Sequence, residues 1–265
     1  MLIDLLFIGT IIFILLCLLG IVISYSWAKR QNAIYPKTMK NVDNYTFFFQ
    51  TIVDNNGEKS GLEALLRKFD EDKQEWIFPD DIDKFTLREV IHLLNKSFVK
   101  INHPSDFIAI NISLNQLADP RYEYFIRWVK GEAYPMEPRI EFNVELTDRV
   151  GFIMKSRIKK NLKISREINV HVILEKIEPT KKYYKKIKWL LNDIYGVKIP
   201  LSKFQKKNDS EWFDLNIGDW VRLIRSKNKN IDITEVEDVE GLDLANKLKI
   251  DNRQGYFIDK PHSEK

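Results

Sequence analysis

Hydrophobic and polar positions divide the chain into an apolar N-terminal run and a longer region of short, repeating patterns. Residues 5–24, LLFIGTIIFILLCLLGIVIS, contain no charged side chain. A run of this length is enough to cross a bilayer as a helix. It lacks a basic start and exceeds the apolar core of a cleaved signal peptide. The pattern predicts a membrane anchor over residues 1–27.

Strand-like and helical patterns alternate from Tyr45 onward. Strand patterns cover residues 45–53, 61–69, 107–113, 139–147, 168–174, 196–200, 230–234 and 253–258, and amphipathic helical patterns cover 80–95, 119–130, 180–192, 211–225 and 238–249. Asn55, Asn56 and Gly57 form a turn signal that predicts a hairpin from the first two strands. The alternation favours an α/β fold with a mostly parallel sheet, and about eight strands favour a (β/α)₈ barrel of the TIM type.

Composition agrees with one large folded domain behind the anchor. The chain has 265 residues, of which 44% are hydrophobic and 30% charged, so a sizeable core is available. Residues 28–44 are polar and basic and contain Pro36, which predicts a short linker. The barrel domain is therefore expected over residues 45–265. The formal net charge of +4 does not select a class of partner.

Charge and cysteine usage indicate the compartment. Lys29 and Arg30 directly follow the apolar run, and positive residues flank the cytoplasmic end of membrane helices. We therefore expect a single-pass membrane protein whose C-terminal domain is cytoplasmic. Cys17 is the only cysteine and lies within the apolar run, which excludes a disulfide framework and a cysteine metal site.

Most of the predicted strands carry a polar residue within them or at one end. These residues are Glu63, Asn111, Glu145, Lys198, Glu235 and Gln254. The carboxyl ends of barrel strands converge on one mouth, where such folds place their chemistry. Three carboxylates with an amide oxygen, and no cysteine or suitably spaced histidine, predict a site for a hard cation such as Mg²⁺ or Mn²⁺.

The chain resembles the EAL family of cyclic di-GMP phosphodiesterases over nearly all of residues 45–262. The matching segments, in family order, are FFQTIVD (48–54), GLEALLR (61–67), INISLNQL (110–117), VELTD (144–148), VKIPLSKF (197–204), TEVED (234–238) and QGYFIDKP (254–261). The resemblance implies a (β/α)₈-type barrel whose opening strand runs antiparallel, in agreement with the predicted hairpin.

Site roles follow from the resemblance residue by residue. It implies that four residues match ligands of two Mg²⁺ or Mn²⁺ ions: Glu63, Asn111, Glu145 and Glu235. It implies that Arg67 holds a substrate phosphate and that Lys198 helps to place the attacking water. Gln254 and Gln50 are expected at the substrate.

The resemblance breaks at the end of the fifth strand. The family has two adjacent aspartates and a glycine-rich loop there, where this chain has HVILEKIEP (171–179). In the best alignment Leu174 replaces the first aspartate and Glu175 the second, which leaves Glu175 as the one carboxylate at this point that could hold an ion. Two cations held close together need bridging carboxylates. The departure therefore predicts reduced metal occupancy and weak hydrolysis.

Three functions remain open from the sequence. The favoured one is a non-hydrolytic module of cyclic di-GMP signalling that binds the nucleotide or a protein partner at the membrane. The second is an active metal-dependent phosphodiesterase in which Glu175 rescues one ion. The third is a scaffold for a membrane enzyme that binds no nucleotide. A homodimer is expected from the resemblance, although the loop that helps to form its interface is altered.

A basic stretch between Lys155 and Lys188 has its own set of interpretations. It carries twelve lysines and arginines against three glutamates. Solvated outer faces of two helices are one explanation, and contact with the anionic inner leaflet is another. We expect no nucleic-acid partner, because Tyr183, Tyr184 and Trp189 are better explained by helix packing than by base stacking.

Overall fold

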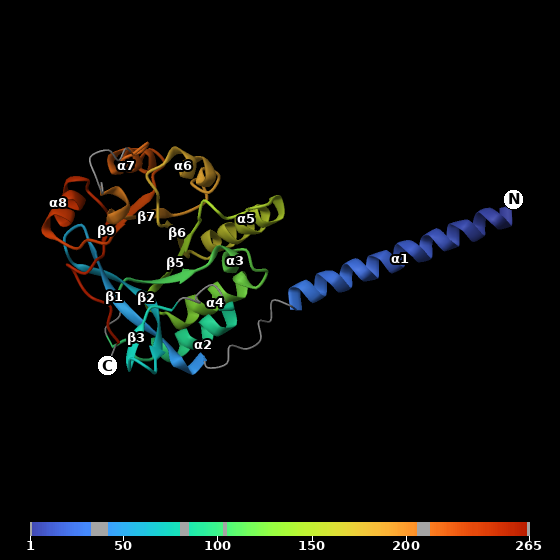
Figure 1. Cartoon of the computed structure of the whole chain (residues 1–265), viewed down its shortest axis with the longest axis horizontal. Coiled ribbons are helices and arrows are strands. Elements are labelled where there is room, and N and C mark those ends of the chain that lie inside the picture. The colour runs from blue at the N-terminus through green and yellow to red at the C-terminus, as the bar shows by residue number, and fades with distance from the viewer. Residues whose placement is uncertain (1, 33–41, 80–84, 103–104, 206–212, 264–265) are drawn as a thin grey trace.

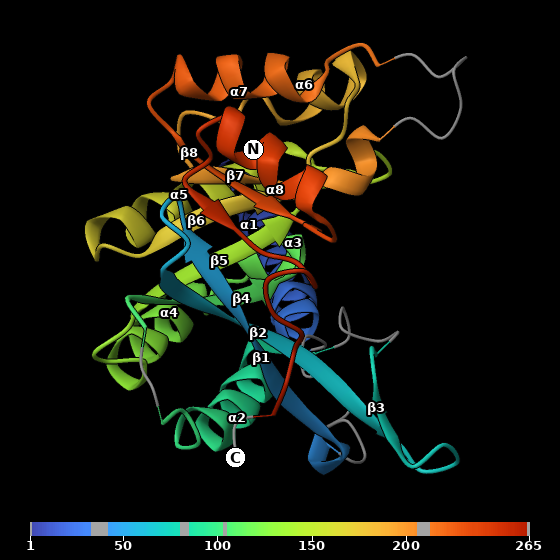
Figure 2. The ribbon, with the colours of Figure 1, turned by 90° about the vertical axis from the view of Figure 1, so that its left-hand side faces the viewer.

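A computed structural model describes residues 2–32, 42–79, 85–102, 105–205 and 213–263. Eight strands close into a barrel in the order β1-β9-β8-β7-β6-β5-β4-β2, with β3 added on the edge of β2 (Figures 1 and 2). The strands are β1 (Tyr45–Asp54), β2 (Lys59–Asp70), β3 (Glu75–Ile77), β4 (Phe107–Ile112), β5 (Glu137–Asn143), β6 (His171–Glu175), β7 (Gly196–Pro200), β8 (Asn230–Thr234) and β9 (Asn252–Arg253). Strand β1 pairs antiparallel with both neighbours, as the hairpin pattern predicts.

Helices surround the barrel and separate most of the parallel strands. They are α2 (Leu87–Phe98), α3 (Leu114–Leu117), α4 (Tyr122–Glu132), α5 (Phe152–Glu167), α6 (Lys181–Ile187), α7 (Ile217–Arg225) and α8 (Val239–Lys247), with 3₁₀ turns at Val42–Asn44 and Leu201–Phe204. Side chains at the N-caps fix where several of them begin. Thr86, Ser113 and Asn216 each form a capping box, and the Asp238 carboxylate accepts a hydrogen bond from the Gly241 amide. Such caps satisfy amides that have no partner within the helix.

The two faces of the barrel wall differ sharply in polarity. Side chains alternate between the faces along each strand. The outward face packs against the helices and forms the main hydrophobic core, with Ile110, Phe142 and Leu174 among its fully buried members. Among the described residues, the interior has a small apolar cluster of Ile52, Phe107 and Ala109, and Ile173 also faces inward. Most other interior side chains near the carboxyl end are polar or charged, which needs dense internal pairing.

Helix α1 (Leu2–Asn32) precedes the barrel. Its segment Leu6–Tyr25 has a mean hydropathy of 3.2, and none of it is buried by the rest of the protein. Its length and composition are sufficient to cross a membrane. The helix continues five residues beyond the predicted anchor boundary at residue 27, and residues 33–41 of the predicted linker lie outside the described residues.

Several predicted element boundaries are wrong. Strand β5 ends at Asn143 rather than 147, because the next residues form a turn in which the Glu145 amide donates to Asp148 Oδ2 at 2.8 Å. Strand β9 covers Asn252–Arg253 and so shares only Arg253 with the predicted 253–258, because the chain then turns to bond the segment after β8. Helix α6 stops at Ile187 instead of 192. Strand β3 was not predicted, and predicted helical residues 80–84 and 211–212 lie outside the described residues.

We expect Gly255→Ala to lower the free energy of unfolding by about 1–3 kcal/mol, the usual cost of overpacking. A Cβ at Gly255 would lie 2.1 Å from the Val236 carbonyl oxygen and 2.3 Å from its nitrogen. Gly131→Ala in α4 is the control, because a Cβ there meets no atom within 4 Å. Chemical denaturation of both variants measures the difference. An unchanged midpoint for Gly255→Ala would contradict this close packing.

Candidate functional site

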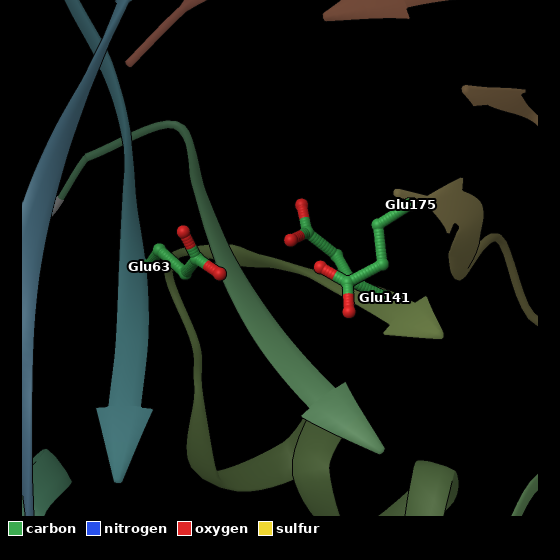
Figure 3. A group of neighbouring side chains, drawn as sticks. All are labelled: Glu63, Glu141 and Glu175. Carbon is green, nitrogen blue, oxygen red and sulfur yellow. The ribbon is translucent and has the colours of Figure 1, made fainter. Parts of the chain in front are cut away.

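Three carboxylates from strands β2, β5 and β6 meet inside the barrel toward its carboxyl end. Glu63 comes from β2, Glu141 from β5 and Glu175 from β6, with their carboxylates turned toward one another (Figure 3). One oxygen of each lies within 4.8 Å of one oxygen of each of the others. Glu63 and Glu141 are buried, and Glu175 keeps a 16% exposed side chain. We call these three residues the carboxylate cluster.

Lys198 supplies the positive charge for this cluster. Its Nζ lies 2.5 Å from Glu141 Oε2 and 3.1 Å from Glu63 Oε2, and its side chain is 4% exposed. Lys198 lies on β7, whose other face packs Val197 and Ile199 against the helices. The buried Lys198 ammonium therefore compensates one negative charge of the carboxylate cluster.

Burial and Lys198 shift the pKa values of the cluster in different directions. Burial, with repulsion from Glu63 and Glu175, raises the pKa of Glu141 to about 8 despite Lys198. Burial also raises the pKa of Glu175. At Glu63 the effect of burial is outweighed by Lys198 and by hydrogen bonds, so its pKa lies below the usual value. Burial opposes the charge of Lys198, but Glu141 and Glu63 raise its pKa overall.

Amide side chains complete the polar shell around Glu63. Asn111 Nδ2 donates to Glu63 Oε1 at 2.6 Å, and Gln254 Nε2 donates to Glu63 Oε2. Gln254 Nε2 also donates to Gln50 Oε1 at 2.8 Å, and Gln50 Nε2 donates to the Asp259 carbonyl oxygen at 2.8 Å. The structure thus brings six of the sequence-predicted site residues together: Glu63, Asn111, Glu175, Lys198, Gln254 and Gln50.

Three buried acceptor oxygens in this shell have no hydrogen-bond donor among the described residues. They are Asn111 Oδ1, Glu141 Oε1 and Gln254 Oε1. A buried oxygen without a partner is costly, and a bound cation removes that cost. Opposite oxygens around Mg²⁺ or Ca²⁺ lie about 4–5 Å apart, which the spacing of the carboxylate cluster matches. The residues present therefore fit a hard cation.

Arg67 lies further along β2 on the same strand face as Glu63. Four residues of strand separate their Cα atoms by about 13 Å. The Arg67 guanidinium carbon lies 5.9 Å from the ring centroids of both Phe48 and Phe78, and Nη1 donates to the Leu66 carbonyl oxygen at 2.9 Å. The half-buried guanidinium retains donors for an anionic group.

A cavity of about 790 Å³ opens beside the cluster. Asn111, Asn143 and Glu175 line it on the barrel side, while Phe85 and Met154 line it on the helix side. Ligand pockets commonly have volumes of 300–1,000 Å³. The cavity is therefore large enough for a nucleotide-sized molecule next to the carboxylates.

Two predicted metal ligands lie outside the carboxylate cluster. Glu145 follows the end of β5, is exposed, and accepts a hydrogen bond from Thr147 Oγ1 at 3.2 Å. Glu235 is exposed, has a φ of 60°, and accepts from the Ser202 amide at 3.3 Å. Glu141, which the sequence interpretation did not name, joins the cluster instead. Leu174 faces the helices, and Glu175 takes the interior position.

A second buried charge pair lies nearer the amino end of the barrel and was also missed. Arg139 Nη1 lies 2.6 Å from Asp232 Oδ2, and both side chains are almost fully buried. Asp232 Oδ1 accepts from the Asn230 and Asn252 amides at 2.7 Å each. One signal was present in the sequence: Arg139, Glu141 and Asn143 alternate with apolar residues, which places all three on one strand face.

Solved structures with the same fold carry EAL domains. An EAL domain protein from Listeria monocytogenes is 22% identical, with a TM-score of 0.64, covering 86% of this chain and 95% of that one. The Bacillus subtilis YkuI protein, solved with substrate cyclic di-GMP and calcium, is 17% identical with a TM-score of 0.66, covering 85% and 56%. The FimX EAL domain from Pseudomonas aeruginosa, bound to cyclic di-GMP, is 15% identical with a TM-score of 0.64, covering 83% and 92%.

Sequence comparison identifies the family directly. No curated protein matches the chain. The family model described as EAL domain matches residues 33–261, which is most of the sequence. The closed barrel, its antiparallel first strand and the fold of the solved relatives agree with that match. The protein therefore belongs to the EAL domain family.

Proposed function

We propose that this protein is a membrane-anchored EAL domain that binds cyclic di-GMP together with one divalent cation and does not hydrolyse it efficiently. The observation that carries the proposal is the carboxylate cluster with its three unpartnered acceptor oxygens beside a nucleotide-sized cavity. The relatives solved with cyclic di-GMP have the same fold. Cyclic di-GMP signalling is therefore the favoured context.

One cation fits the cluster better than two. Two close cations need several bridging carboxylates. The two other carboxylates expected as ligands, on Glu145 and Glu235, are exposed and lie outside the cluster. Lys176 Nζ lies 3.9 Å from Glu175 Oε1, so it adds positive charge where a second cation would sit. Mg²⁺ and Mn²⁺ are the ions we propose for the remaining position.

The residues of this chain have distinct roles in the proposed complex. Glu63, Glu141 and Glu175 would hold the cation with the free oxygens of Asn111 and Gln254. A bound cation supplies positive charge for a phosphate oxygen of the ligand. Arg67 would hold the other phosphate, because it lies on the same strand face as Glu63 with its Cα about 13 Å further along β2. Lys198 keeps Glu63 and Glu141 in place, and Gln50 orients Gln254.

Substitution at Glu141 tests whether Glu141, as in the structure, or Glu145, as expected from sequence, is the cation ligand. We expect Glu141→Gln to weaken cation-dependent cyclic di-GMP binding about tenfold or more, because glutamine cannot lose a proton to become the anionic oxygen ligand that a cation binds. Glu145→Gln is the comparison variant: Glu145 lines the cavity but lies outside the carboxylate cluster, so its substitution should leave the Mg²⁺ dependence of binding unchanged. Calorimetry on the full chain, with and without Mg²⁺, measures both. Weaker binding for Glu145→Gln alone would overturn the structural assignment.

Two alternative functions, an active phosphodiesterase and a scaffold, predict different experimental results. Glu175 joins the cluster, which favours an active phosphodiesterase as the second candidate. Turnover of cyclic di-GMP with Mn²⁺ that disappears in Glu63→Ala would establish that enzyme and replace our proposal. A protein that binds no cyclic di-GMP at high micromolar concentration, with or without Mg²⁺, would instead be a scaffold for a membrane enzyme. A homodimer remains a prediction that sedimentation can test.

The membrane anchor is also part of the proposal. Helix α1 is long and apolar enough to span a bilayer, and Lys29 and Arg30 follow its apolar segment. We therefore propose a cytoplasmic barrel, because basic residues remain on that side. Protease treatment of inverted and right-side-out vesicles distinguishes the two orientations. Release of the barrel in soluble form with loss of the N-terminus would identify a cleaved signal instead.

A further inference from the structure

Two large apolar side chains stand out at the start of helix α5. Phe152 is 88% exposed and Ile153 is 66% exposed, in the first turn of the helix. Neither side chain belongs to the hydrophobic core or packs against it. Adjacent exposed apolar residues of this size indicate a contact surface more often than a solvated one.

Lysines surround this apolar tip on α5 and α6. The exposed members are Lys155, Lys159, Lys160, Lys163, Lys181, Lys182, Lys185 and Lys188, and we call them, with Phe152 and Ile153, the basic surface. The only acidic residue on the two helices is Glu167, which pairs with Lys163 at 3.8 Å. Most of the other lysines have no ion pair within the described part of the chain. The charge of this surface is therefore largely uncompensated.

The two helices form one continuous surface. Contacts connect the start of α5, and the segment that precedes it, to α6 and the residues that follow α6. Lys155 Nζ lies 5.4 Å from the centroid of the Trp189 ring, which follows α6. Lys186 Nζ donates to the carbonyl oxygen of Leu146 at 2.8 Å and to that of Asp148, both in the segment before α5. These contacts fix Lys155 and Lys186 beside the start of α5, where Phe152 and Ile153 lie.

We propose that the basic surface docks on an anionic phospholipid bilayer. Clustered lysines attract anionic headgroups, and an exposed aromatic and aliphatic pair can insert at the interface. Lysine is depleted at protein interface cores, so a surface with eight of them fits a lipid headgroup layer better than a protein partner. Base stacking on nucleic acid needs several exposed aromatic rings, whereas Phe152 is the only one on α5 and α6 that is fully exposed.

Docking in this orientation would bring the cavity mouth close to the membrane. Arg149 and Met154, which flank Phe152 and Ile153 in the sequence, both line the cavity beside the carboxylate cluster. The surface proposal stands independently of nucleotide binding, because it rests on exposure and charge outside the cluster.

Helix α8 offers a matched control surface on the same barrel. Val239 is 56% exposed in the first turn of α8, as Ile153 is in α5. Its neighbours are acidic, however: Glu237, Asp238, Glu240 and Asp243. Anionic lipid should therefore attract the start of α5 and repel the start of α8.

Fluorescence in nanodiscs tests the proposal on the full chain. An environment-sensitive dye is attached at Ile153→Cys or Val239→Cys after Cys17→Ser removes the native thiol. With phosphatidylglycerol, we expect a blue shift and at least about twofold stronger quenching by spin-labelled lipid at position 153 only. High salt and the variant Lys159→Glu/Lys182→Glu should abolish both effects.

Other outcomes would overturn the proposal. Equal signals in purely zwitterionic nanodiscs, or at position 239, would show that the tether alone brings the dye to the lipid. A signal that appears without lipid and grows with protein concentration would identify this surface as an interface between two copies. Circular dichroism of each variant establishes that it remains folded, so that an absent signal also counts against docking.

Discussion

Replacing Lys198 by methionine should lower the free energy of unfolding by about 3–5 kcal/mol, because removal of one partner leaves buried charge uncompensated. Lys198 Nζ contacts both Glu63 and Glu141, and all three side chains are at most 7% exposed. Without the ammonium, these carboxylates must take up protons on folding. Chemical denaturation of the full chain, followed by near-ultraviolet circular dichroism of the barrel, measures the loss.

The pH dependence of this variant has a definite sign. A carboxylate whose pKa is raised in the folded state binds more protons than it does in the unfolded chain. Stability therefore falls as pH rises above the ordinary glutamate pKa toward the raised value, which is about 8 for Glu141 in the unaltered protein. The loss caused by Lys198→Met should accordingly be larger at mildly alkaline than at mildly acidic pH. A loss independent of pH would mean that the methionine acts through packing alone.

Cation and charge controls separate the possible causes. Millimolar Mg²⁺ should stabilise Lys198→Met more than the unaltered protein, because the carboxylate cluster then lacks its ammonium. The double variant Lys198→Met/Glu141→Gln should recover part of the loss, since it removes one charge of each sign. Lys182→Met, at an exposed position on α6, should change stability by no more than about 0.5 kcal/mol. Identical Mg²⁺ effects in all variants would contradict a cation site at the cluster.

Breaking the Arg139–Asp232 pair should have an effect of similar size. We expect Asp232→Leu to cost about 3–5 kcal/mol, because it leaves the buried guanidinium of Arg139 without its counter-charge. Arg139→Met should cost less, since Asp232 still accepts hydrogen bonds from Asn230 and Asn252. Thermal and denaturant unfolding of both variants gives the comparison.

A double-mutant cycle identifies the charge pair as the cause. Arg139→Met/Asp232→Leu should be more stable than Asp232→Leu, because neither charge then remains buried. Arg222→Met is the surface control: it breaks a pair with Asp219 at 2.5 Å in which Arg222 is 78% exposed, and such pairs contribute about 0–1 kcal/mol. Additive losses in the double variant would show that the two side chains act independently.

The sequence could not decide whether Glu141 or Glu145 points into the barrel. Both are glutamates near the end of the same strand, four residues apart, and Glu145 lies in the segment that matches the family motif. The strand ends at Asn143, so only Glu141 keeps the side-chain direction that points into the barrel. A turn formed by the Glu145 amide and Asp148 decides this end point. Local hydrogen bonding of that kind is not visible in hydrophobic periodicity.

Glu175 is a second residue whose position the sequence could not decide, because neighbouring strand residues face opposite sides of the barrel wall. Alignment placed Leu174 at the position of the first family aspartate. In the barrel Leu174 is fully buried in the outer core, and its neighbour Glu175 takes the interior position. A shift of one residue exchanges the two faces of a strand, so this assignment depends on the register between β5 and β6.

The sequence by itself determined the architecture and predicted the kind of chemistry. Its alternating patterns predicted the barrel, its turn predicted the antiparallel opening strand, and its polar strand residues predicted a cation site with oxygen ligands. These features depend on periodicity and residue type, which are local. Only the tertiary structure decided which carboxylates share the site, that Lys198 lies among them, and that Arg139 and Asp232 form a second buried pair. Those outcomes depend on strand register and closure of the barrel, which bring distant residues together and are not encoded in any one segment.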